Sequence, residues 1–171
     1  TGSEGAGSSL AEAAGKNLKK SVLELGGSDA FIVLEDADLE NAVENAVTGR
    51  FGNMGQACTS SKRIIVVEEI ADAFLEKFKS KLEGLKVGDP LEKDTEVGPL
   101  SSEEAAKKSE KQVKKTVKAG AKVVIGGKRI DREGAFFEPT ILTDIEKGMT
   151  AYHEEIFGPV VAITKADNFE Q

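Results

Sequence analysis

The sequence is poor in the residues that build several common kinds of functional site. Its 171 residues include one cysteine, Cys58, one histidine, His153, one tyrosine and no tryptophan. A single cysteine forms no internal disulfide, which fits a reducing compartment, so we expect a cytoplasmic protein. A lone histidine argues against a histidine-based metal centre and against a Ser-His-Asp triad. We therefore expect no metal, and a nucleophile in this chain would need a carboxylate as its base.

Excess positive charge and long apolar stretches are also missing. The formal net charge is −7, whereas a general nucleic-acid binder needs a basic surface. No apolar run approaches the roughly 20 residues that span a bilayer. We expect neither nucleic acid nor a membrane among the partners. Hydrophobic residues at 39% and charged residues at 31% are instead typical of a globular domain.

Strand-like and helix-like segments alternate along the chain. Apolar and β-branched runs predict extended segments at 21–25, 30–34, 62–69, 122–127, 136–144 and 159–166. Apolar residues at helical spacing predict helices at 8–18, 36–51, 70–84 and 101–121. Ser8 or Ser9 is the expected cap of the first helix, and Pro139 indicates that its run is an edge strand or a connection. The alternation predicts an α/β domain with a mostly parallel sheet flanked by helices.

The stretch FGNMGQACTSSKR, residues 51–63, places the cysteine in a loop of small and polar residues. A lone cysteine in a reducing compartment is ordinarily an inert core residue. Gln56, Thr59 and the glycines around them form no apolar pocket, so we expect Cys58 to lie near solvent among backbone N–H groups. Such a setting stabilises a thiolate and an oxyanion. A core thiol and a nucleophile both stay open as interpretations at this point.

Glu24 is a carboxylate inside the apolar run SVLEL, directly before Gly26 and Gly27. If this run is a strand, alternation places Glu24 on the same face as Val22. One interpretation is an edge residue that faces water. The other is a glutamate withdrawn from water, the environment that suits a general base near neutral pH.

Three further stretches are weaker signals. HEEIFGP, residues 153–159, is compatible with a solvated turn before a strand. GSEGAG, residues 2–7, is a glycine turn at the start of a helix, which is a natural phosphate seat, but its order is not that of the dinucleotide fingerprint. EDADLE, residues 35–40, lacks the glycine of a calcium loop and is expected to be a helix cap.

Taken together and in this order, the motifs resemble those of the aldehyde dehydrogenase superfamily. LELGG (23–27) matches the glutamate motif of that family, and NMGQAC (53–58) matches its N-x-G-Q-x-C nucleophile motif. EEIFGPV (154–160) matches a cofactor-contacting motif, and TGS followed by Gly7 matches the turn and helix at the cofactor phosphates. The resemblance covers essentially the whole chain and is nearest to succinate-semialdehyde-dehydrogenase-like members.

The resemblance implies a role for each of these residues. Cys58 is the expected nucleophile and Glu24 the expected general base. The expected contacts to the cofactor, NAD or NADP, are Gly2 and Ser3 at the pyrophosphate, the Leu25 backbone near the carboxamide, Glu155 at the nicotinamide ribose and Phe157 beside the nicotinamide. The implied reaction oxidises an aldehyde, with succinate semialdehyde as the implied substrate, to a carboxylic acid. It passes through a cysteine thiohemiacetal and a thioester that water hydrolyses.

The resemblance also implies how the chain is organised. Residues 1–22 are expected to be the end of the cofactor-binding domain, and residues 23–171 a catalytic domain truncated at its C-terminus. We therefore expect a catalytic-domain fragment of a longer, homo-oligomeric enzyme, and we expect the fragment alone to be inactive.

Other functions on the same fold stay open. An acylating or acyl-phosphate-reducing relative would share the cysteine, although Glu24 favours the branch that hydrolyses its thioester. A catalytically inactive binding or structural fragment is the alternative from a different class of protein. Gly52 stands where some succinate-semialdehyde enzymes place an arginine, which weakens the assignment of that substrate.

Overall fold

The computed structural model of the chain describes residues 1–168 and 170. Five of its helices and five strands run in the order α1 (Glu4–Lys16), β1 (Ala30–Val33), α2 (Leu39–Phe51), β2 (Arg63–Val67), α3 (Glu68–Glu83), α4 (Glu103–Lys118), β3 (Lys122–Ile125), β4 (Thr140–Thr143), α5 (Thr150–His153) and β5 (Val160–Ala166). A short 3₁₀ turn, Gly52–Gly55, follows α2. Among the described residues, no helix combines the length and apolar character that crossing a bilayer requires.

The strands form one sheet in the order β1-β2-β5-β4-β3. β1 pairs with β2, β2 with β5 and β5 with β4 in parallel, and β3 pairs with β4 in antiparallel fashion. The predicted α/β fold with a mostly parallel sheet is therefore confirmed. The expected edge position of the run around Pro139 is wrong, because β4 is an internal strand. Pro139 precedes the first residue of β4 and so removes no hydrogen bond from the ladder.

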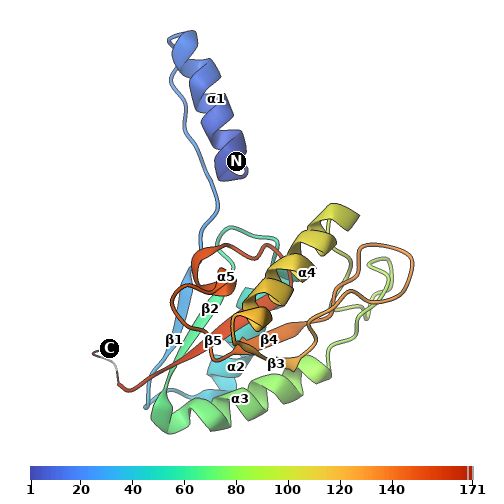
Figure 1. Cartoon of the computed structure of the whole chain (residues 1–171). Helices are drawn as coiled ribbons and strands as arrows, with labels where there is room; N and C mark the ends of the chain where they lie inside the picture. Colours follow the sequence, from blue (N-terminus) through green and yellow to red (C-terminus); the bar gives the residue numbers. More distant parts are fainter. Residues whose placement is uncertain (169, 171) are drawn as a thin grey trace.

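Helices cover both faces of the sheet (Figure 1). On one face, α2 and α3 pack against β1, β2, β4 and β5, and the rings of Phe74 and Phe78 stack at a centroid distance of 5.5 Å. On the other face, Ala106 and Val113 of α4 join a second apolar cluster with Leu142 and Val160. Internal strands buried on both faces have apolar side chains on both, which explains the β-branched runs in the sequence.

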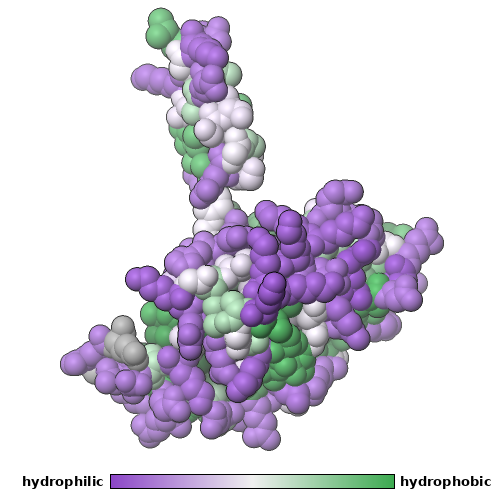
Figure 2. All heavy atoms as spheres, viewed as in Figure 1, coloured by the Kyte–Doolittle hydropathy of each residue, from purple (hydrophilic) through white to green (hydrophobic). Residues whose placement is uncertain are grey.

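The outer side of α4 is hydrophilic (Figure 2). The β1 side of the sheet, by contrast, exposes apolar side chains. The side chains of Ile32 and Leu34 on the β1 side stay 62% and 39% exposed. With Ile65 and Tyr152 they line an open hollow of about 440 Å³. This end of the sheet therefore exposes an apolar surface to solvent.

The first helix stands apart from the body of the molecule, and residues 17–29 run back beside it to β1 (Figure 1). The predicted helix at 8–18 capped by Ser8 or Ser9 begins earlier than expected. Ser3 is the cap, and its Oγ accepts a hydrogen bond from the N–H of Ala6 at 3.3 Å. The predicted strand at 21–25 is also wrong, because these residues pair with no strand in the described part of the chain.

Candidate active site

The cysteine lies in a turn whose backbone is constrained at three consecutive residues. After α2, Asn53, Met54 and Gly55 have φ angles of 49°, 60° and 68°, the left-handed region that side chains disfavour. Gly55 has no room for a side chain, since a Cβ there would lie 2.5 Å from the carbonyl oxygen of Gly158. The turn ends at Cys58, whose side chain is exposed. The expectation of a solvent-accessible thiol agrees with this position.

Side-chain amides close the same turn. Asn53 Nδ2 donates to the carbonyl of Gln56 at 3.2 Å, and Gln56 Nε2 donates to the carbonyl of Asn53 at the same distance. Gln56 Oε1 also accepts from the N–H of Ser101 at 2.8 Å, just before α4. The two amides therefore fix the shape of the loop and attach it to the start of α4.

A buried guanidinium joins this loop to the segment that precedes β5. Arg50, on α2, is fully buried, and its Nη1 donates to Ser60 Oγ at 2.7 Å and to the carbonyl of Gly55. Its Nη2 and Nε donate to the carbonyls of Ile156, Gly158 and Val160. Burial lowers the pKa of Arg50 to about 10, while the negative charge of Glu155 acts in the opposite direction. The guanidinium therefore keeps its proton, and its full set of donors, at neutral pH.

We expect Arg50→Met to destabilise the fold, because it takes the guanidinium donors away from five buried carbonyl and hydroxyl acceptors. Loss of one partner from such a network costs roughly 3 kcal/mol or more. A thermal melt of a full-length protein that carries this sequence measures the effect. Arg63→Met is the matched control, because Arg63 is partly exposed and makes one backbone contact, from Nε to the carbonyl of Ser28 at 2.9 Å. Equal melting temperatures for the two variants would contradict the prediction.

A second buried cation contacts the cysteine directly through its backbone. The side chain of Lys62 is 4% exposed, and Nζ donates to the carbonyls of Ala57 at 2.9 Å, Cys58 at 2.7 Å and Ser60 at 3.2 Å. The same Nζ lies 3.0 Å from Oε1 of Glu155. Lys62 therefore joins the loop that carries the thiol to a carboxylate of the EEIFGPV motif.

Three of the residues predicted to contact a cofactor line one hollow. Ser3, Glu155 and Phe157 surround a space of about 460 Å³, together with Gly26 and Lys108. The Glu155 carboxylate leans on Gly26 so closely that a Cβ at that glycine would collide with Oε2. Gln112 of α4 holds the same segment, since its Nε2 donates to the carbonyl of Glu155 at 3.1 Å. The hollow thus lies between the start of α1, the residues after Leu25 and the loop before β5.

The remaining predicted site residues lie near this hollow but outside its lining. Gly2 donates its N–H to the carbonyl of Glu24 at 3.0 Å, which fastens the start of α1 to the LELGG motif. Leu25 packs on the buried Gly7, where a Cβ would lie 2.7 Å from Leu25 Cδ2. The Glu24 side chain is exposed, so the described residues do not withdraw it from water. Cys58 is joined to the hollow through Lys62 and Glu155.

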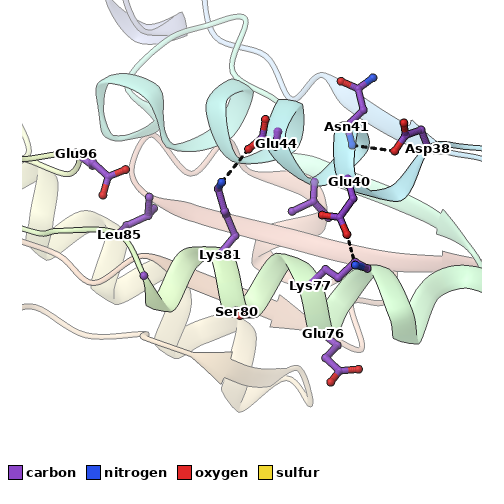
Figure 3. A pocket seen from close by; sticks show the side chains of 12 residues that line it. Asp38, Glu40, Asn41, Glu44, Glu76, Lys77, Ser80, Lys81, Leu85 and Glu96 are labelled. Carbon is purple, nitrogen blue, oxygen red and sulfur yellow. Dashed lines mark hydrogen bonds and ion pairs between the residues drawn. The ribbon is translucent and has the colours of Figure 1, made fainter.

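The molecule has a larger hollow elsewhere, between α2 and α3 (Figure 3). Its volume is about 1040 Å³, and its walls are charged. Lys81 pairs with Glu44 at 2.8 Å and Lys77 pairs with Glu40 across it. The hydrogen bond from Lys81 lowers the pKa of Glu44, and the side chains of Lys81 and Glu44 stay 48% and 67% exposed. These charged side chains pair with one another in contact with water, and they do not place a nucleophile beside a base. This hollow is therefore a solvated groove between two helices.

No metal centre accompanies the candidate site in the described part of the chain. Residues 1–168 and 170 contain no group of three or more His, Cys, Asp and Glu side chains that could hold an ion. His153 Nε2 accepts a hydrogen bond from the N–H of Gly148 at 2.9 Å. The histidine therefore stabilises the segment that precedes the EEIFGPV motif.

Arg50 and Lys62 were not predicted from the sequence. For Arg50 a signal existed, because it falls at helical spacing with Val43, Ala46 and Val47, on the face of α2 that packs on the sheet. A cation on an apolar stripe indicates a buried charge with partners from elsewhere. For Lys62 no local signal existed, because the carboxylate that pairs with its buried ammonium, Glu155, is distant in the sequence.

These observations define an α/β domain in which an exposed thiol is held beside a polar hollow by two buried cations. Residues 1–171 match the sequence model of the aldehyde dehydrogenase family, and the chain belongs to this family. The family predicted from the four motifs is therefore confirmed.

Individual relatives are similar over nearly the whole chain. The succinate-semialdehyde dehydrogenase (NADP+) 1 of Mycobacterium tuberculosis is 50% identical over 171 residues, which are 100% of this chain and 37% of the relative. The corresponding Deinococcus radiodurans enzyme is 51% identical over 163 residues, 95% of this chain and 34% of the relative. A crystal structure of succinate-semialdehyde dehydrogenase from Burkholderia pseudomallei superposes with a TM-score of 0.94 at 39% identity, covering 99% of this chain and 35% of that one. The chain thus spans little more than a third of the length of these relatives.

Proposed function

We propose that a full-length protein carrying this chain oxidises an aldehyde to a carboxylic acid with NAD or NADP. The observation that carries the proposal is the exposed Cys58, whose backbone Lys62 links to Glu155. Glu155 lines a hollow together with Ser3 and Phe157, and Arg50 supports the thiol loop through Gly55 and Ser60. The named relatives support it further, because all three are succinate-semialdehyde dehydrogenases and the names of those from Mycobacterium tuberculosis and Deinococcus radiodurans specify NADP+. Succinate semialdehyde is accordingly the substrate we propose.

The residues around the hollow fit a dinucleotide. The N-terminus of α1, with Ser3 as its cap, presents backbone N–H groups to an anion, which suits a pyrophosphate. The Glu155 carboxylate, which leans on Gly26, accepts hydrogen bonds and suits the hydroxyl groups of a ribose. Phe157 is 40% exposed and offers an aromatic side to a planar ring. We assign Gly2 and Leu25, which position the start of α1 and its neighbour, to the same cofactor site.

In the proposed reaction, Cys58 provides the nucleophile. Its thiolate adds to the aldehyde carbon, and the carbonyl oxygen becomes the hydroxyl of a thiohemiacetal. When bound, NAD or NADP would supply the oxidant as a hydride acceptor; loss of a hydride from the former aldehyde carbon and of the hydroxyl proton to solvent would turn this adduct into a thioester. Water then cleaves the thioester to a carboxylic acid and returns the thiol. The constrained loop suits the first step, because a thiol in a fixed, accessible position meets substrate without rearrangement.

We assign the activation of water to Glu24. Its backbone is fixed by Gly2, and its side chain is free of the sheet. A positioned carboxylate can take a proton from the attacking water.

We also propose that residues 1–22 are the end of the cofactor-binding domain and that residues 23–171 belong to the catalytic domain. The separation of α1 from the body of the molecule supports this division (Figure 1). A cytoplasmic, homo-oligomeric enzyme is the form we propose, and the single free thiol supports a reducing compartment.

An aldehyde panel tests the proposal. The full-length protein is mixed with NAD or NADP and with succinate semialdehyde, a short unbranched aldehyde or an aromatic aldehyde, and reduced cofactor is followed by absorbance. We expect turnover with succinate semialdehyde to exceed that with the uncharged aldehydes, and the acid to appear in equal amount with reduced cofactor. Reduced cofactor with no acid, or cofactor reduction only when coenzyme A or phosphate is added, would contradict the hydrolysing reaction.

A further inference from the structure

We propose that Lys62 is a positioning residue. It holds the loop that carries the Cys58 thiol and the carboxylate of Glu155, at the proposed cofactor site, in one fixed arrangement. The inference rests on the proposed function and adds to it a residue that touches neither substrate nor cofactor. Lys62 acts through two groups, the backbone of Cys58 and the carboxylate of Glu155.

The burial of this ammonium shows that its contacts are needed. Among the residues that the structure describes, Lys62 is the buried lysine, whereas the side chains of paired lysines such as Lys77, Lys81 and Lys165 are 44%, 48% and 43% exposed. An ammonium has three donors and loses much solvation free energy when it leaves water. Here three backbone carbonyls and one carboxylate surround it within 3.2 Å. The surrounding acceptors replace its water shell.

The position of these acceptors gives Lys62 its function. The three carbonyls belong to residues 57, 58 and 60, so one cation fixes the backbone on both sides of the thiol. The contact with Glu155 Oε1 is an ion pair rather than a directed hydrogen bond, and that oxygen has no hydrogen-bond partner among the described residues. Attraction to Lys62 therefore keeps the carboxylate at the wall of the hollow, against Gly26.

Arg50 holds the same region in a different way. Its guanidinium contacts Gly55, Ser60 and the carbonyls of residues 156–160, but neither the Cys58 backbone nor the Glu155 side chain in a direct hydrogen bond. Arg50 supports the loop that carries Cys58 and the segment that precedes β5. Lys62 instead fixes the positions of the Cys58 backbone and the Glu155 carboxylate. Substitution of Lys62 removes the donor of buried acceptors and so lowers stability, as for Arg50, but it should in addition change cofactor binding and turnover.

The test compares Lys62→Met and Lys62→Gln in the full-length protein. Groups that orient directly acting residues typically contribute 10- to 100-fold, so we expect Lys62→Met to raise the cofactor Kd and lower kcat about tenfold each. Lys62→Gln keeps a donor for the carbonyls but removes the charge that holds Glu155, so the cofactor Kd should rise while kcat falls less. Lys165→Met, which removes two exposed ion pairs, with Glu68 and Asp72, is the matched control and should change both values less than about twofold.

A double-mutant cycle shows whether Lys62 acts through Glu155. Glu155→Gln alone should also raise the cofactor Kd, and adding Lys62→Gln to it should raise the Kd little further, because the pair is already broken. Kd is measured by calorimetry, apart from turnover. Wild-type Kd and kcat in Lys62→Gln would overturn the proposal, even if Lys62→Met fails to fold, and so would fully additive effects in the cycle. A wild-type protein that binds no cofactor and oxidises no aldehyde would refute both proposals together.

Discussion

Replacement of Cys58 by serine is expected to lower aldehyde oxidation by roughly 10⁴-fold or more, with the fold intact. The thiol is exposed on a loop whose shape comes from Asn53, Gln56 and Lys62, so a hydroxyl of similar size needs no repacking. A hydroxyl has no accessible anionic state near neutral pH, and its ester would form far more slowly. The measurement is the rate of cofactor reduction in the full-length protein.

Two controls accompany this measurement. The circular dichroism spectrum of Cys58→Ser should match that of the wild type, and its cofactor Kd should be unchanged, since Ser3, Glu155 and Phe157 line the hollow without Cys58. Turnover near the wild-type rate would rule out Cys58 as the nucleophile. A loss of cofactor binding would mean that the loop, rather than the thiol, had been damaged.

Glu24→Gln is expected to separate the two halves of the reaction. Glutamine keeps the shape of the side chain but cannot accept a proton, so hydrolysis of the thioester should slow about 100-fold or more. Formation of the thioester should continue for one turnover. A burst of reduced cofactor, followed by an acylated Cys58 in the intact mass spectrum, is the expected result.

Glu12→Gln is the matched carboxylate control for this variant. Glu12 lies on α1, where it forms an exposed ion pair with Lys16 at 2.7 Å, so its loss should leave turnover within about twofold of the wild type. If Glu24→Gln also turns over at the wild-type rate, with no acylated protein, Glu24 serves the structure of the LELGG turn instead.

The elements with strong patterns were predicted from the sequence because their determinants are local. Asp38 caps α2 through a hydrogen bond from the N–H of Asn41 at 3.2 Å. The helix cap predicted in EDADLE, residues 35–40, is therefore confirmed. The β-branched run at 62–69 contains β2, an internal strand of the sheet in which Ile64 and Val66 are buried. Composition was sufficient there, because β-branched residues favour strands.

The predictions failed where tertiary contacts decide the structure. Residues 21–25 alternate like a strand, but a strand needs a hydrogen-bonding neighbour, and the described residues supply none. The first helix extends back to Glu4 despite Gly5 and Gly7, which are poor helix formers. The reason lies outside the helix, since Gly7 is where Leu25 packs against it. Lys62 was missed for the same kind of reason, because its partner Glu155 is distant in the sequence.

The left-handed backbone at Asn53 and Met54 determines when the free energy of this unfavourable conformation is spent, during folding or on substrate binding. Such angles are unfavourable by about 1–3 kcal/mol for a residue with a side chain, yet Met54 is buried and the turn is held by amides and cations on every side. The unfavourable conformation is therefore adopted during folding, before any substrate arrives. A preorganised turn loses little further entropy on binding, so in the proposed reaction we expect the thiol to meet each aldehyde in one geometry rather than through induced fit.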